Sequence, residues 1–263
     1  MNGPRIVAIT CDDGPWPGNT TTVMNHMRNA GLEHDFGLVH FFMVGNYVAT
    51  FPDVAREVFE RGYGIGNHSL THSTYSASGL AREIPLAQDV FSSVLGWAPE
   101  LFRAPGLAKA DALQAQLYRL GFANILTSTI LNDHLLPRIS SSQIIANVSR
   151  TIHPGNIILL HDGGSHTQTV NAFPGIINTI HSQGYEIVRL EEVLATGTLQ
   201  YQAAAYEITA SEIAAAEATD GADGVIDVVV ELRTYLELNT NLSAERRRMV
   251  EAMIAEARLA ARG

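Results

Sequence analysis

The sequence has very little of three things on which many functions depend: cysteine, lysine and long apolar runs. Cys11 is the only cysteine in 263 residues, which excludes an intrachain disulfide and a cysteine zinc cluster. Lys109 is the only lysine and the formal net charge is −10, which disfavours phosphate contacts with DNA or anionic membranes. Apolar runs such as Ile157–Leu160 are too short for a transmembrane helix. We therefore expect no nucleic-acid partner and no membrane partner.

The chain also shows no pattern of a signal peptide. Polar residues Met1–Pro4 lead directly into a strand-like stretch. We expect either a cytoplasmic protein or the mature form of a secreted protein whose leader has been removed.

With 46% apolar and 17% charged residues, the composition excludes a disordered chain. It predicts one sizeable core with room for an appended subdomain.

Short β-rich runs alternate with helical patterns over residues 1–197. Strands are expected at Arg5–Thr10, Leu38–Val44, Tyr63–Asn67, Glu100–Arg103, Phe122–Thr127, Asn156–Leu160 and Glu186–Val188. Helices are expected at Thr20–Ala30, Pro52–Arg61, Leu80–Leu95, Asp111–Leu120, Ser141–Ile152 and Val170–Gln183. Glycines that are typical of helix ends follow four of these helices: Gly31, Gly62, Gly121 and Gly184. The alternation predicts an α/β fold with a parallel sheet, open or closed as a barrel.

The pattern changes after Gly197, and residues 198–263 contain no histidine, proline or cysteine. A capping-box pattern at Thr209–Glu212 opens an alanine-rich stretch, and Ser243 precedes a final helical pattern with one apolar face. We expect a mostly helical C-terminal extension without chemistry of its own. It would pack on the first domain or on a second copy of the chain, so that a homo-oligomer is a candidate.

Residues suited to catalysis follow five of the predicted strands, where the functional groups of parallel β/α proteins gather. They are Asp12 and Asp13, His68 and His72, Arg103, Asp133, and His161. The spacing of the two histidines predicts that both imidazoles lie on one side of a helical turn, although surface histidines can share that spacing. Two histidines and a carboxylate form a common catalytic zinc set. Of two adjacent aspartates, one can ligate a metal while the other serves as a base.

Five segments resemble the motifs of polysaccharide deacetylases, the NodB-like domain of carbohydrate esterase family four. Thr10–Pro15 is similar to the family's Thr-Phe-Asp-Asp-Gly-Pro motif, and His68–His72 to its motif of two histidines four residues apart. Phe102–Gly106 resembles the Arg-x-Pro-Tyr-Gly motif, Asp133 stands where the family has an Asp-Trp pair, and Leu159–His161 resembles the last motif. Order and spacing agree over residues 5–195. The resemblance implies a distorted (β/α)7-type barrel over residues 1–197, and the extension at 198–263 lies outside it.

The resemblance also implies a role for each matched residue. Asp13, His68 and His72 would hold one divalent metal ion, usually zinc in this family, with cobalt or another divalent ion as the alternative. Asp12 would be the general base and His161 the general acid. Arg103 would orient Asp12, and Asp133 would pair with His161.

The expected substrate-binding residues include several departures from the family pattern. Pro105 would shape the site, and Leu159 would line the pocket for the acetyl methyl group. Gly106 stands where the family has tyrosine, and its backbone N–H could still serve an oxyanion hole. His134 replaces a tryptophan that walls the family's groove, and Trp16 could supply another stacking face. These changes leave the chemistry intact and put the binding of long glycans in doubt.

The expected function is hydrolysis of N-acetyl groups on a carbohydrate that contains GlcNAc, such as a chitooligosaccharide or peptidoglycan. Two alternatives use the same site: an O-acetyl esterase of the acetylxylan type, and a hydrolase of a small non-sugar amide. A third alternative, a carbohydrate-binding or structural pseudoenzyme, is disfavoured because every residue needed for metal, base and acid is present. Failure to bind metal would favour it.

Overall fold

A computed structural model describes residues 4–33, 36–72, 77–107, 113, 116–117, 120–127, 129–134, 139–196, 248 and 251. These residues form a parallel β-sheet with covering helices, which confirms the α/β class. They divide into two compact units. None of the helices described has both the length and the apolar character that a membrane crossing requires.

Strand β1 (Ile6–Gly14) is the centre of the first unit, which takes the described residues of Met1–Met43, Phe51–Gly66 and Leu126–Ala203. It pairs in parallel with three strands: β2 (Val39–Met43), β7 (Asn156–His161) and β8 (Glu186–Ile187). Beyond these, β3 (Gly64–Asn67) lies next to β2, and β6 (Thr129–Ile130) pairs with β7. The side chains of β1 from Val7 to Cys11 are fully buried, as expected for a parallel strand that is covered on both faces.

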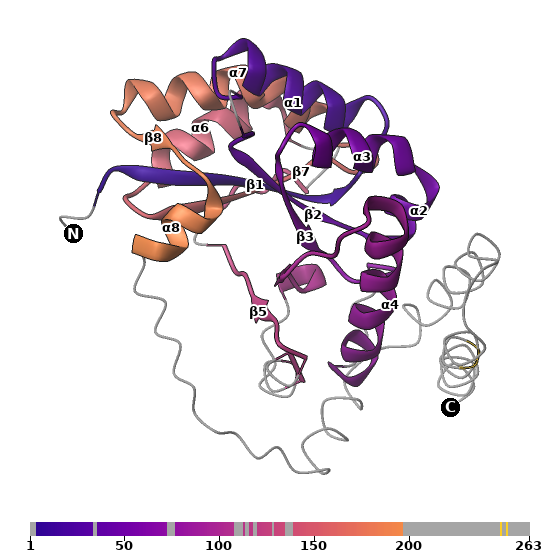
Figure 1. Ribbon diagram of the computed structural model, residues 1–263. Coiled ribbons are helices and arrows are strands. Elements are labelled where there is room, and N and C mark those ends of the chain that lie inside the picture. The colour runs from indigo at the N-terminus through magenta and orange to yellow at the C-terminus, as the bar shows by residue number, and fades with distance from the viewer. Residues whose placement is uncertain are drawn as a thin grey trace. The chain divides into compact units, whose positions relative to one another are not determined.

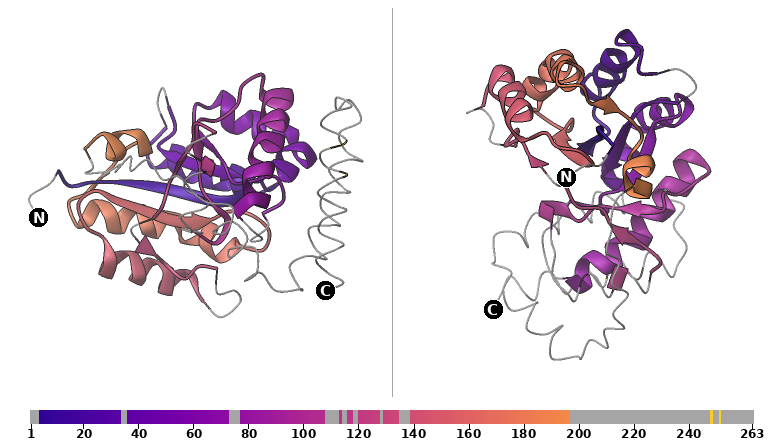
Figure 2. Two further views of the ribbon diagram at one scale, coloured as in Figure 1. Left: turned by 90° about the horizontal axis from the view of Figure 1, so that it is seen from below. Right: turned by 90° about the vertical axis from the view of Figure 1, so that its left-hand side faces the viewer.

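Four helices cover one face of this sheet. They pack side by side in the order α3 (Pro52–Glu60), α1 (Asn19–Asn29), α7 (Thr167–Ser182) and α6 (Ser141–Thr151), as the right-hand view of Figure 2 shows. Helix α8 (Leu190–Thr196) contacts β1 from the other face (Figure 1). The sheet of this unit is therefore covered on both sides, and the carboxyl ends of its strands are where polar groups collect.

The second unit includes Val44–Thr50 and Asn67–Ile125. Asn67, the last residue of β3, pairs with Phe102 of β4 (Leu101–Phe102), and β4 pairs with β5 (Ala123–Asn124). Helix α2 (Gly45–Thr50) packs against α4 (Ala77–Leu95), and a short 3₁₀ helix spans Pro105–Leu107. The paired strands run in the order β5-β4-β3-β2-β1-β7-β6, so in the described residues their path has two ends and does not close.

Of the four glycines that were expected to end helices, Gly31, Gly62 and Gly184 follow the described helices α1, α3 and α7, and Gly121 has the same geometry after a segment that is described only in part. Their φ angles lie between 69° and 80°, the left-handed region that glycine adopts without strain. In each case the next residue donates its N–H to a carbonyl five residues earlier, which is the hydrogen bond of a Schellman cap. These bonds are Leu32 to Met27, Tyr63 to Val58, Phe122 to Leu117 and Tyr185 to Ile180.

The structure differs from the sequence-based expectation in several elements. Among the described residues it contains four that were not predicted: α2, the 3₁₀ helix at Pro105–Leu107, β6 and α8. Asp133 consequently follows the two-residue strand β6 and not the strand expected at Phe122–Thr127. Only parts of the helix expected at Asp111–Leu120 are described, and the expected helices of the 198–263 extension lie outside the described residues apart from Arg248 and Glu251.

Candidate metal and catalytic site

Strand β1 ends in two aspartates at a β-bulge. Asp12 is aligned with His161 of β7, and the register with β2 shifts between Asp12 and Gly14. The residue between them, Asp13, has a φ of 71°, which is uncommon outside glycine and clusters at functional sites. A Cβ on Gly163 would come within 2.1 Å of the Asp13 carbonyl oxygen, so only glycine fits there. The bulge re-aims the Asp13 side chain relative to that of Asp12.

His161 and Asp133 form a hydrogen-bonded pair, as expected from the sequence. The Nδ1 atom of His161 lies 2.9 Å from Asp133 Oδ1, and the His161 backbone N–H donates to Oδ2 at 2.8 Å. The Thr169 hydroxyl also donates to Asp133 Oδ2, at 3.0 Å. Asp133 is buried, so these contacts fix the orientation of the imidazole and direct Nε2 away from the carboxylate.

The protonation of His161 reflects two opposing effects. Burial by itself lowers the pKa of the imidazole, because a buried charge is poorly solvated. The hydrogen bond to Asp133 and the negative charges of Asp133, Asp13 and Asp12 outweigh burial and raise the pKa of His161 to about 9. The imidazole is therefore protonated at neutral pH in the metal-free protein, as a general acid needs to be.

The loop that carries His68 and His72 is not the helical turn that the spacing predicted. Ser69 and His72 have φ angles of 66° and 61°, which interrupt a right-handed helix. The two imidazole rings are nevertheless neighbours, with centroids 5.0 Å apart. His68 Nδ1 lies 2.8 Å from the Arg103 carbonyl oxygen, which can only accept a hydrogen bond. Nδ1 therefore donates to this carbonyl, and Nε2 is the atom that a metal would take.

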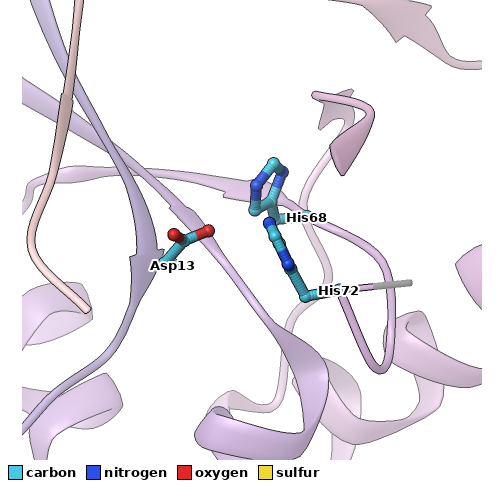
Figure 3. A group of neighbouring side chains, drawn as sticks. All are labelled: Asp13, His68 and His72. Atoms are coloured by element: carbon cyan, nitrogen blue, oxygen red, sulfur yellow. The ribbon is translucent and has the colours of Figure 1, made fainter. Parts of the chain in front are cut away.

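The side chains of Asp13, His68 and His72 each offer a ligand atom, and these atoms all lie within 4.8 Å of one another (Figure 3). Two imidazole nitrogens and one carboxylate oxygen are a donor set that suits zinc and leave room for water in a catalytic site. The carbonyl that holds His68 Nδ1 is the kind of outer partner that zinc-binding histidines have. The residues present therefore fit a divalent metal ion.

Comparison with known proteins shows the family of the chain. A family model for polysaccharide deacetylases matches residues 2–125. A peptidoglycan-N-acetylglucosamine deacetylase of Bacillus cereus is 33% identical over 199 residues, which cover 73% of this chain and 90% of the relative. The chain belongs to the polysaccharide deacetylase family.

Two further similarities agree with this assignment. A chitooligosaccharide deacetylase of Bradyrhizobium is 30% identical over 210 residues, covering 73% of this chain and 92% of that protein. Among solved structures, the family-four esterase domain of a multidomain xylanase from the hindgut metagenome of Trinervitermes trinervoides superposes with a TM-score of 0.64 at 26% identity. That match covers 73% of this chain and 91% of the domain.

Arg103, which the family resemblance assigns to the orientation of Asp12, is fully buried. Its Nε donates to the Ile125 carbonyl at 2.9 Å, and its backbone N–H donates to the Asn67 carbonyl at 3.0 Å. Together with the contact of its own carbonyl to His68, these bonds tie Arg103 to the residue before the first histidine and to the end of the next strand. The orientation of Asp12 by Arg103 stays a prediction.

The expected substrate-binding residues differ in burial and in the residues that they contact. Pro105 is buried in the 3₁₀ helix, and Gly106 has a φ of 61°, a conformation that suits glycine better than the family's tyrosine. Leu159 is buried two residues before His161 on β7, so both side chains project from the same face of the strand. His134 is exposed with its ring 6.2 Å from that of His161, and Trp16 packs edge-on against Phe51 at 5.3 Å.

Asp162 is a buried acid to which the sequence assigned no role. Its backbone N–H donates to the Asp12 carbonyl at 3.1 Å, and its carboxyl accepts a hydrogen bond from the Thr20 hydroxyl. Burial, joined by the charges of Asp13 and Asp12, raises the pKa of Asp162 to about 7. A Cβ on Gly14 would meet this carboxyl at 2.8 Å, which explains glycine at that position. The only sequence signal was its place directly after His161 at the end of a buried strand.

Proposed function

We propose that this protein is a metal-dependent deacetylase that removes N-acetyl groups from carbohydrate containing GlcNAc, such as chitooligosaccharide or peptidoglycan. The observation that carries the proposal is the cluster of Asp13, His68 and His72, with Asp12 adjacent to the first of them in the chain. The hydrogen-bonded pair of His161 and Asp133 supplies the acid. Family membership and relatives named as deacetylases of these two substrates support the choice of carbohydrate.

The proposed reaction divides the proton transfers between two side chains of opposite charge. A divalent ion held by Asp13, His68 and His72 would polarise the acetyl carbonyl and make water acidic enough to attack at neutral pH. The Asp12 carboxylate takes a proton from the attacking water. The His161 imidazolium gives its proton to the departing nitrogen, so that the amine leaves as a neutral group.

The neighbouring residues maintain these protonation states. Asp133 holds the imidazolium through the 2.9 Å contact with Nδ1, which leaves the Nε2 proton for the leaving group. Arg103 would orient Asp12, the role that the family resemblance implies for it. Leu159 shares the strand face of His161 and would offer an apolar surface to the acetyl methyl group.

One comparison favours an O-acetyl ester as a second candidate substrate, because the similar Trinervitermes trinervoides domain belongs to a xylanase. Acetate release from N-acetylchitooligosaccharides, peptidoglycan fragments, acetylated xylan and a small N-acetyl amide would separate the candidates. We expect the zinc-loaded protein to release acetate fastest from the first two. Faster release from xylan would assign the site to esters, and release from the small amide alone would contradict a carbohydrate substrate.

A further inference from the structure

The loop between the two proposed histidine ligands is unusual because its backbone N–H groups donate to side chains. The Ser69 N–H donates to Asn67 Oδ1 at 2.8 Å, and the His72 N–H donates to Ser69 Oγ at 3.0 Å. The N–H groups of Leu70 and Thr71 both donate to Glu83 Oε2, at 3.2 and 3.1 Å. Four consecutive N–H groups are thus satisfied without a helix or a strand.

Among these acceptors, Asn67 and Ser69 lie within three residues of the donors they serve, and Glu83 alone is distant in the sequence. It lies on α4, is completely buried, and also accepts a hydrogen bond at Oε1 from the Thr71 hydroxyl. Acidic side chains are rarely buried to this degree unless their oxygens are occupied by donors. Three donors to Glu83 come from the two adjacent residues that stand between Ser69 and His72.

The loop needs an external support because its conformation is not one that the chain adopts readily. Ser69 and His72 both have left-handed φ angles, of 66° and 61°, although neither is glycine. From the other side, the first residues of α2 contribute: the Gly45 and Asn46 N–H groups donate to the Ser69 and Leu70 carbonyls, each at 2.9 Å. The loop is therefore held between the start of α2 and the Glu83 carboxylate.

We infer that Glu83 is a positioning residue for the metal site: its carboxylate fixes the loop so that the His68 and His72 imidazoles are presented to one ion. The inference rests on the proposed function. Residues that hold metal ligands in place act on metal affinity, and their loss costs about 10- to 100-fold. Glu83 itself ligates nothing in this arrangement, because its oxygens are turned to the loop backbone and the Thr71 hydroxyl.

The replacement of Glu83 by glutamine or alanine should have graded effects. Glu83→Gln keeps one carbonyl oxygen for the Leu70 and Thr71 N–H groups, and its amide NH₂ can donate to the Thr71 hydroxyl, which also accepts. Glu83→Ala leaves both backbone donors buried without an acceptor. Thr71→Val removes only the hydroxyl donor and preserves the side-chain shape. Val90→Ala, in a buried position on the same helix, is the control for a loss of packing alone.

The test is the zinc affinity of the full-length protein, measured by competition with a chromophoric chelator. We expect Glu83→Ala to weaken zinc binding about 10- to 100-fold, and Glu83→Gln and Thr71→Val to weaken it measurably but by less than about 10-fold. Val90→Ala should lower the unfolding temperature and leave zinc affinity unchanged. In the metal-free protein, hydrogen exchange of the Leu70 and Thr71 amides should accelerate in Glu83→Ala and not in Val90→Ala.

The outcomes separate this inference from the proposed function. A wild-type protein that bound no zinc would contradict the proposed function and the inference with it. Wild-type zinc binding together with unchanged affinity in Glu83→Ala would overturn the role of Glu83 alone. Should Glu83→Ala not fold, unchanged affinity in both Glu83→Gln and Thr71→Val, with unchanged exchange of the Leu70 and Thr71 amides, would overturn it equally.

Discussion

At the scale of single residues, the carboxylates of the site differ in backbone conformation and in hydrogen-bond partners. Asp12 and Asp13 are adjacent in the chain, and the bulge at the end of β1 gives them different backbone conformations. The Asp133 carboxylate is hydrogen-bonded to the His161 imidazole. The Asp162 carboxyl accepts a hydrogen bond from the Thr20 hydroxyl, and the Asp162 backbone N–H donates to the Asp12 carbonyl. In the proposed reaction the end of β1 would supply a metal ligand and a base, and the end of β7 the acid, whose partner Asp133 follows β6.

Asp12→Asn should separate catalysis from metal binding. The amide cannot take a proton from water, so we expect acetate release to fall by about 10²- to 10⁴-fold. The three proposed ligands remain, and zinc content should stay close to that of the wild type. Parallel measurement of turnover and bound zinc checks this. Near-normal turnover would show that another group is the base.

Asp133→Asn should lower the pKa of His161 in the metal-free protein. Burial lowers the pKa of His161, and the Asp133 charge is one of the effects that raise it. Without that charge, the pKa should drop from about 9 by about 1 to 3 pH units. The imidazole signal followed by NMR against pH gives this value directly, with the exposed Asp53→Asn as the matched control. An unchanged pKa would mean that Asp133 does not maintain the imidazolium.

The same pair makes a prediction for stability. Folding raises the pKa of His161 above its ordinary 6.5, so the folded state holds the proton more tightly than the unfolded state. The contribution of this group is fully present below pH 6.5 and is lost as the pH rises through about 9. The free energy of unfolding of the metal-free wild type should therefore decline over that window more steeply than that of Asp133→Asn.

At the scale of the elements, much of the fold could be predicted because helix ends and buried strands leave local signals. Gly31, Gly62 and Gly184 follow the ends of α1, α3 and α7 in left-handed conformations, as expected. The fully buried β1 appears in the sequence as a nearly continuous apolar run. The predicted strands were sufficient to place Asp12, Asp13 and His161 at strand ends, whereas Asp133 follows the unpredicted β6.

The elements that sequence patterns missed have little pattern to detect. Strand β6 is two residues long, and α2 begins at Gly45, a weak helix former. The loop of His68 and His72 was misjudged because its shape comes from Asn67, Ser69 and Glu83 side chains. Glu83 lies eleven residues beyond His72, and only the packing of α4 brings it under the loop. Tertiary hydrogen bonds of this kind leave no periodicity.

Helix α6 allows a test of local stability away from the site. Ser140 and Gln143 form a capping box, in which the Ser140 hydroxyl accepts the Gln143 N–H and the Gln143 side chain accepts the Ser140 N–H. Ser140→Ala should lower the free energy of unfolding by about 1 kcal/mol. Ser140→Thr keeps the acceptor oxygen and should cost less. Denaturant unfolding measures both, and a change in zinc affinity in either variant would contradict the local role.

At the scale of the whole chain, the family similarity and the described fold account for roughly the first 196 residues, and the extension is a separate question. We propose that residues 198–263 form helices that pack on the catalytic domain or on a second copy of the chain. The proposal rests on their composition and on an apolar stripe of Met249, Val250, Met253 and Ile254. If this stripe were exposed to solvent, it would favour aggregation.

Truncation near Gly197 should therefore lower solubility, thermal stability or oligomeric state without removing zinc or turnover. Zinc content, acetate release and light scattering of the shortened chain test this expectation. A soluble and folded truncation that bound zinc and had lost all turnover would show that the extension takes part in substrate binding. An unchanged oligomeric state would point to packing on the same chain.

The central claim is that Asp13, His68 and His72 hold the metal on which deacetylation depends. The most direct measurement is acetate release from an N-acetylchitooligosaccharide by the full-length protein before chelation, after chelation and after zinc is restored. We predict that chelation abolishes release and that zinc restores it in the wild type, whereas His72→Ala neither retains zinc nor recovers. Undiminished release after complete removal of metal, or full activity of His72→Ala, would contradict the account.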